Sequence, residues 1–89
     1  MSADIHVDPE ILDEFANALN RFQDTLEEEL QSLKSEWSRC SETFIGGQAN
    51  KFAENFDATC QSISQTVEVG RESAQQLKRY QEAVHRALG

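Results

Sequence analysis

The sequence predicts an all-α protein, a two-helix antiparallel hairpin that pairs with another hairpin into a four-helix bundle dimer. Apolar residues recur at spacings of three and four through both halves of the chain, which is the period of one helical face. The double glycine Gly46-Gly47 lies near the middle of the 89 residues, where glycine ends one helix and turns the chain. Five Phe, one Trp and one Tyr are more apolar surface than two helices bury against each other.

The first elements are a short arm over about residues 1–7 and a helix over about 9–43. Asp8 suits the N-cap, and Pro9 suits the first helical position, where its missing N–H has no partner to lose. No helix breaker follows until Gly46. The apolar stripe of this helix consists of Leu12, Phe15, Leu19, Phe22, Leu26, Leu30, Leu33, Trp37 and Cys40.

A turn over about residues 44–47 leads to a second helix over about 48–88, so that residues 1–89 form a single hairpin domain. The second helix again mixes spacings of three and four. Its apolar stripe consists of Ala49, Phe52, Phe56, Cys60, Ile63, Val67, Gly70, Ala74, Leu77, Tyr80, Val84 and Leu88.

Pairing residues symmetrically about the turn tests whether the two stripes fit each other. This register places Trp37 opposite Phe56 and Phe22 opposite Gly70. We expect Gly70 to be a notch that admits the Phe22 ring, because interiors are close-packed. The alternatives for a mid-helix glycine are a bend or a close approach across a dimer.

The same register bears on the two cysteines, Cys40 and Cys60. They are offset by roughly seven residues, or about 10 Å along a helix, which is more than the Cα separation of a disulfide. We therefore expect no bridge between them and two reduced packing residues instead.

The stripes predict which residues form the core and the interface. A small two-helix core is marginal alone, so we expect a homodimer or a heterodimer with a related helical hairpin. A loose monomer is the alternative. The predicted core and interface residues are Phe15, Leu19, Phe22, Leu26, Leu33, Trp37, Phe52, Phe56, Ile63, Leu77 and Tyr80.

The net charge of −8 is uneven, because residues 1–45 carry 11 acids and 3 bases whereas residues 46–89 carry five of each. Such a chain is a poor ligand for nucleic acid or an anionic membrane. No apolar run is long enough to span a bilayer. No segment resembles a signal peptide, which indicates either a cytoplasmic protein or export by a route that does not use one.

Residues typical of catalysis, cofactor binding or metal binding do not form a motif in this chain. There is no nucleophile elbow and no zinc set, and His6 and His85 lack the spacing of metal ligands. Gly46-Gly47 is not a phosphate loop, because no Lys-Ser or Lys-Thr follows it. We therefore expect no catalytic residue, no cofactor and no metal, and a protein that is not an enzyme.

The opening His6–Glu10, the ending Leu33–Trp37 of the first helix, and the start of the second helix resemble those of the WxG family. These are small helical hairpins exported by type VII (Esx) secretion systems. The resemblance places the W-x-G turn at Phe44-Ile45-Gly46, with Phe in place of Trp and Gly47 after it. Trp37 lies seven residues before Phe44 and is not the motif residue.

The C-terminal export signal of the family, Y-x-x-x-D/E, has no match here, because Tyr80 is followed four residues later by Val84. The resemblance implies a homodimer or heterodimer that is a substrate or partner in type VII secretion, with a secretion ATPase or a larger effector as further partners. It is then secreted without a cleaved signal peptide, or cytoplasmic if the signal is truly absent. The alternatives are an intracellular adaptor of a larger effector and a self-assembling secretion subunit.

Overall fold

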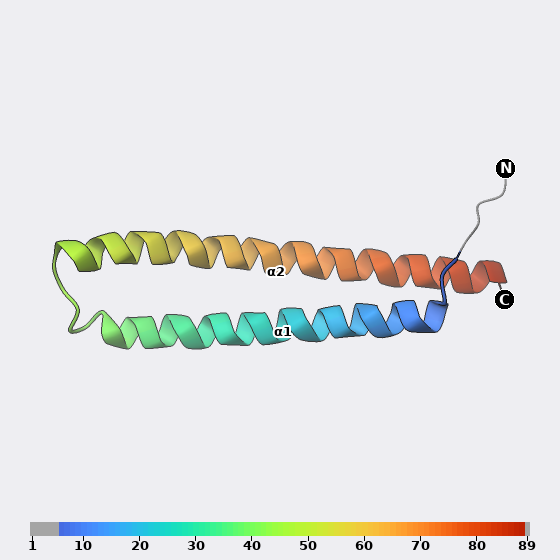
Figure 1. Cartoon of the computed structure of the whole chain (residues 1–89), viewed down its shortest axis with the longest axis horizontal. Coiled ribbons are helices and arrows are strands. Elements are labelled where there is room, and N and C mark those ends of the chain that lie inside the picture. Colours follow the sequence, from blue (N-terminus) through green and yellow to red (C-terminus); the bar gives the residue numbers. More distant parts are fainter. Residues whose placement is uncertain (1–5, 89) are drawn as a thin grey trace.

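The computed structural model describes residues 6–88, so most of the arm expected at residues 1–7 lies outside the described residues. Helix α1 spans Pro9–Cys40 and helix α2 spans Gly47–Leu88, and the two run antiparallel side by side (Figure 1). The hairpin is a thin rod of 64 × 24 × 14 Å. Within residues 6–88 there is no strand, and the predicted helical hairpin is confirmed.

Helix α1 starts where its capping residues predict. The Asp8 carboxylate accepts hydrogen bonds from the backbone N–H groups of Glu10, at 2.9 Å, and Ile11, at 3.4 Å. Pro9 occupies the first turn, where an N–H has no acceptor within the helix. These local contacts fix the point at which the chain enters the helix.

Helix α1 ends at Cys40, earlier than the end expected near residue 43. The Ser41 hydroxyl donates to the carbonyl of Ser38 at 2.9 Å, and the Thr43 hydroxyl donates to that of Cys40 at 3.3 Å. Ser and Thr side chains that bond nearby backbone groups compete with helix continuation. The Phe44 N–H still reaches the Cys40 carbonyl at 3.0 Å, so the helix ends in a tight hydrogen-bonded turn.

The reversal of the chain depends on one glycine rather than two. Gly46 has φ +127°, which residues with a Cβ rarely adopt. Gly47 is already the first residue of α2 and needs no unusual conformation. The turn therefore constrains residue 46 more strongly than residue 47.

The contact between α1 and α2, here called the seam, is lined mostly by small side chains. Among the described residues no large side chain is completely buried. The buried apolar residues are Ala16, Leu30, Ala49, Cys60, Val67, Ala74 and Val84. Both cysteines are free, but the expected packing role fits Cys60 alone, because Cys40 is exposed.

The expected notch for Phe22 is wrong. Phe22 is 60% exposed, and the side chain that occupies the gap at Gly70 belongs to Gln23, which is 4% exposed. The reason is a difference of one residue in helical phase, about 100°. Ala16 and Gln23 face α2, whereas the aromatic residues immediately before them point out of the seam.

Candidate interaction surface

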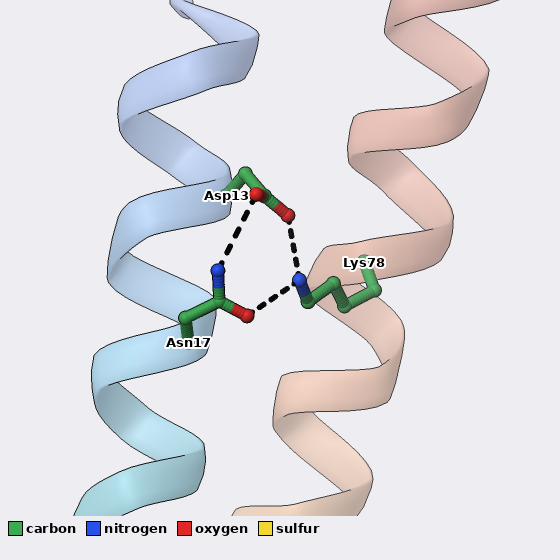
Figure 2. Close-up of polar contacts among 3 residues, drawn as sticks. All are labelled: Asp13, Asn17 and Lys78. Carbon is green, nitrogen blue, oxygen red and sulfur yellow. Dashed lines mark hydrogen bonds and ion pairs between the residues drawn. The ribbon is translucent and has the colours of Figure 1, made fainter.

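One side of the seam is closed by charged and polar side chains. Lys78 Nζ donates to Asp13 Oδ1 at 2.6 Å and to Asn17 Oδ1 at 2.7 Å, and Figure 2 shows the three side chains converging from the two helices. Asn17 Nδ2 donates to Asp13 Oδ2 at 3.4 Å, which closes the triangle. All three side chains are partly buried, so this contact ties the helices together near their open end.

A second ion-pair cluster lies on the same side, because Arg71 and Lys78 are seven residues apart on α2. Arg71 Nη2 lies 2.9 Å from both Asp24 Oδ1 and Glu27 Oε1. The hydrogen bond to Asp24 is the main cause that raises the pKa of the Arg71 guanidinium. A guanidinium is charged at neutral pH, so both contacts are ion pairs between α1 and α2.

The opposite side of the seam is apolar. Around the buried positions Ala16, Gln23, Cys60, Val67 and Ala74, the residues one before or three after point to this side. The ion-paired residues Glu27, Arg71 and Lys78 each lie four residues after a buried position and therefore point to the other side. We call the resulting surface the apolar face. Its members are Phe15, Leu19, Phe22, Leu26 and Leu33 of α1, and Phe52, Phe56, Ile63, Leu77 and Tyr80 of α2.

The largest side chains of the chain are thus outside the seam. Exposed fractions on the apolar face are 57% for Phe15, 60% for Phe22, 51% for Leu33, 46% for Phe52 and 48% for Tyr80. A hairpin that buries alanine and leaves phenylalanine in solvent has an inverted distribution for a monomer. Contiguous exposed apolar surface of this kind marks an interaction site.

The middle of the apolar face holds a shallow groove of about 190 Å³. Leu26, Leu30 and Leu33 of α1 line it, together with Ile63 of α2. The one charged residue at its edge is Glu29. The groove is therefore suited to an apolar side chain from another molecule.

The border of the apolar face on α2 carries no charge between residues 52 and 80. The row that runs along it at seven-residue spacing is Phe52, Thr59, Thr66, Ser73 and Tyr80. On α1 the corresponding row contains Phe15 and Phe22, then Glu29 and Glu36 toward the turn. The charge of the chain therefore lies mostly off this face.

An aromatic cluster closes the hairpin at the turn. Trp37 packs against Phe52, with ring centroids 4.9 Å apart, and against Phe56 at 5.7 Å, which is the neighbour that the predicted register gave it. Phe44 meets the Trp37 ring edge-on at 6.3 Å and 85°. Such aromatic pairs stabilise beyond their buried area by about 0.5–1.5 kcal/mol.

A comparison with protein families supplies the decisive observation. The family WXG100, described as proteins of 100 residues with WXG, matches residues 4–87. The chain belongs to the WXG100 family. WXG100 proteins are small, helical, non-catalytic proteins associated with type VII secretion, and they typically form dimers. No curated protein and no solved structure matches the chain significantly.

The residues that we expect to form the turn motif, Phe44-Ile45-Gly46, each have a distinct environment. Phe44 is 41% exposed and contacts Trp37, whereas Ile45 is 82% exposed. Gly46 takes the positive φ. Phe44 therefore supplies an aromatic contact at the turn end of the hairpin.

Residue 84, where the resemblance would place the acid of a Y-x-x-x-D/E signal, is part of the seam. Val84 is 3% exposed, and Tyr80, four residues earlier, is 48% exposed on the apolar face. Tyr80 and Val84 are therefore about one helical turn apart, but the Tyr80 ring is exposed whereas Val84 is buried. A carboxylate at residue 84 would lie against α1.

Sequence reasoning missed Gln23, whose buried amide lies at the seam. The signal that could have found it is the seven-residue row Ala16, Gln23, Leu30 and Trp37, which follows the α1 side of the seam. Among residues 6–88 no three His, Cys, Asp or Glu side chains gather as a metal site would need. Neither described helix is long and apolar enough to cross a membrane.

Proposed function

We propose that this WXG100 chain is a non-catalytic component of type VII secretion that acts as an exported substrate or as the dimer partner of one. It does so by packing its apolar face against a related helical hairpin to form a four-helix bundle. The observation that carries the proposal is the inverted packing, in which Phe15 and Phe22 are exposed while Ala16 is completely buried. A second hairpin would cover these rings.

A second role, as an intracellular adaptor of a larger effector, is favoured by one observation. Val84 stands where the export signal of the family has its acid, and it is buried at 3% exposure. A chain without that acid depends on another protein for recognition, either a hairpin partner that carries the signal or an effector that does.

The export test compares two hosts that differ only in the type VII ATPase. The tagged full-length chain is produced in both, with and without a candidate partner hairpin, and culture supernatants are compared with lysates. The proposal expects the chain in the supernatant only when the ATPase is present. Retention in the lysate with every partner would refute export and support the adaptor.

The association test uses matched charge substitutions. Phe22→Glu places a carboxylate on the apolar face, and Ser35→Glu places the same charge on an exposed position away from it. We expect Phe22→Glu to abolish association in light scattering while its helical content is kept, and Ser35→Glu to leave association unchanged. Equal behaviour of the two variants would contradict the assigned surface.

A further inference from the structure

The one buried polar residue of the seam, Gln23, has an unsatisfied atom. Gln23 is 4% exposed, and its Oε1 has no hydrogen-bond partner among the described residues. Burying an acceptor without a donor destabilises a fold, so native structures pair nearly all such groups. The described part of the hairpin supplies no donor for this atom, so a second molecule that reaches it could satisfy it.

The amide of Gln23 lies at the gap left by Gly70. A Cβ added to residue 70 would overlap the side-chain amide of Gln23. Gly70 belongs to the row of α2 residues that borders the seam on the apolar side, between Ile63 and Leu77. The glycine therefore leaves an opening between the buried amide and the apolar face.

The apolar side chains around this opening are arranged symmetrically. On α1 the centre of symmetry is the point between Phe22 and Gln23. Leu19 and Leu26 lie at equal distances on either side of it, and Leu12 and Leu33 form a second such pair one heptad further out. On α2, Ile63 and Leu77 lie at equal distances from Gly70. Because Gln23 contacts Gly70, the two centres of symmetry lie at the same height along the rod.

We propose that Gln23 sets the register of a homodimer, in which a second copy of this chain packs antiparallel on the apolar face with the two-fold axis passing beside Gln23 and Gly70. Oε1 of each Gln23 accepts a hydrogen bond from Nε2 of the other copy through the Gly70 opening, so one reciprocal pair satisfies both amides. The inference rests on the proposed function and adds to that function the identity of the partner and the register in which it binds.

A second copy fits this face in shape, size and charge. Rotation about the axis places Leu19 on Leu26 of the second copy and Ile63 on Leu77 of the second copy. The apolar face extends from residue 15 to residue 33 on α1 and from residue 52 to residue 80 on α2, so a second copy would contact the rod over most of its 64 Å length. The uncharged border of α2 faces its own copy without repulsion.

Buried amides are known to define register in helical assemblies, because every shifted arrangement leaves them unpaired. A shift of the second copy by one heptad would keep leucine against leucine on α1. It would also separate the two Gln23 side chains by about 10 Å and leave both buried without a partner. The leucine rows alone do not choose between these arrangements, whereas Gln23 does.

Disulfide trapping tests the register in the full chain with Cys40→Ser, which removes the exposed native thiol. Residue 22 lies next to the proposed axis, so Phe22→Cys should cross-link to itself in mild oxidant. Phe15→Cys is the matched control on the same row of α1, and its two copies would lie about 22 Å apart, too far for a disulfide. Both side chains are exposed, so neither substitution disturbs the seam.

Gln23→Leu tests the residue itself. We expect the variant to remain dimeric in light scattering, because leucine suits an apolar seam, while the yield of the Phe22→Cys cross-link falls several-fold as the register becomes heterogeneous. An unchanged yield in the dimeric variant would show that Gln23 does not set the register. Circular dichroism confirms that the compared proteins are equally helical.

The outcomes separate this inference from the proposed function. A dimer that cross-links at residue 15 but not at residue 22 overturns the axis and leaves a paired hairpin intact. A chain that stays monomeric alone but binds a different hairpin overturns the homodimer and keeps the secretion role. A monomer that binds no hairpin overturns both.

Discussion

Replacing Gly70 with alanine is expected to destabilise the protein, although the same change usually stabilises a helix. Gly70 lies within α2, where alanine is favoured over glycine by about 1 kcal/mol. The added Cβ, however, would overlap the amide of Gln23, which is 4% exposed and therefore has little free space to move. Overpacking of this kind costs about 1–3 kcal/mol.

The two terms together predict a net loss of about 1 kcal/mol of unfolding free energy, the difference between the overpacking cost and the helix gain. For a domain of this size that loss lowers Tm by about 4–8 °C. In a Gln23→Ala background the overlap disappears, and Gly70→Ala should instead stabilise by about 1 kcal/mol. The sign of the effect therefore depends on residue 23.

A double-mutant cycle followed by circular dichroism in urea measures this coupling, with all four proteins at one concentration because association shifts apparent stability. The expected coupling between residues 23 and 70 is about 1–3 kcal/mol. Gly47→Ala is the control, because a Cβ at that helical position would meet nothing within 4 Å. If Gly70→Ala stabilises equally in both backgrounds, the contact between the two residues has no energetic significance.

Two further predictions concern the ends of the rod. Val84→Glu should lower the unfolding free energy by about 2–4 kcal/mol in chemical denaturation, because it removes a buried apolar side chain and buries a carboxylate. The control Ala87→Glu, at an exposed position, should change the unfolding free energy by less than about 0.5 kcal/mol. Equal losses in the two variants would mean that residue 84 is not in the seam. Phe44→Ala should cost about 1 kcal/mol and shift the fluorescence of Trp37 to longer wavelength, since it removes an edge-on aromatic contact. Ile45→Ala, the adjacent exposed residue, should leave both unchanged, and a fluorescence shift in it alone would contradict the role of residue 44.

The parts of this fold that depend on local chemistry were predictable from the sequence. The Asp8-Pro9 start of α1 and the reversal at Gly46 follow from capping and from backbone conformation, which involve neighbouring residues. The register followed too, because a short turn between two long helices leaves little choice, and it brought Trp37 to Phe56. The end of α1 at Cys40 was not predicted, since side-chain hydroxyls compete there with a helical pattern that continues.

The phase of α1 in the seam could not be read from hydrophobicity alone. The apolar stripe suggested that Phe22 faces α2, yet the buried residues are the smaller or more polar Ala16 and Gln23. Two helices alone cannot enclose a phenylalanine ring, because each side chain at the seam has neighbours on one side only. Small residues allow the helices to approach, and the rings are left on the surface where a second hairpin would reach them.

The buried position of Val84 bears both on the stability of the hairpin and on the export that we propose. In a helix the residue four after Tyr80 lies about one turn further along, and in this register it contacts α1 while the ring stays exposed. An acid at residue 84 would therefore oppose closure of the open end, and valine favours it. A homodimer built on Gln23 would present two exposed Tyr80 rings and no acid beside either. Its export would then require recognition of a third protein bound to it, so a homodimer exported without any other chain would contradict this account.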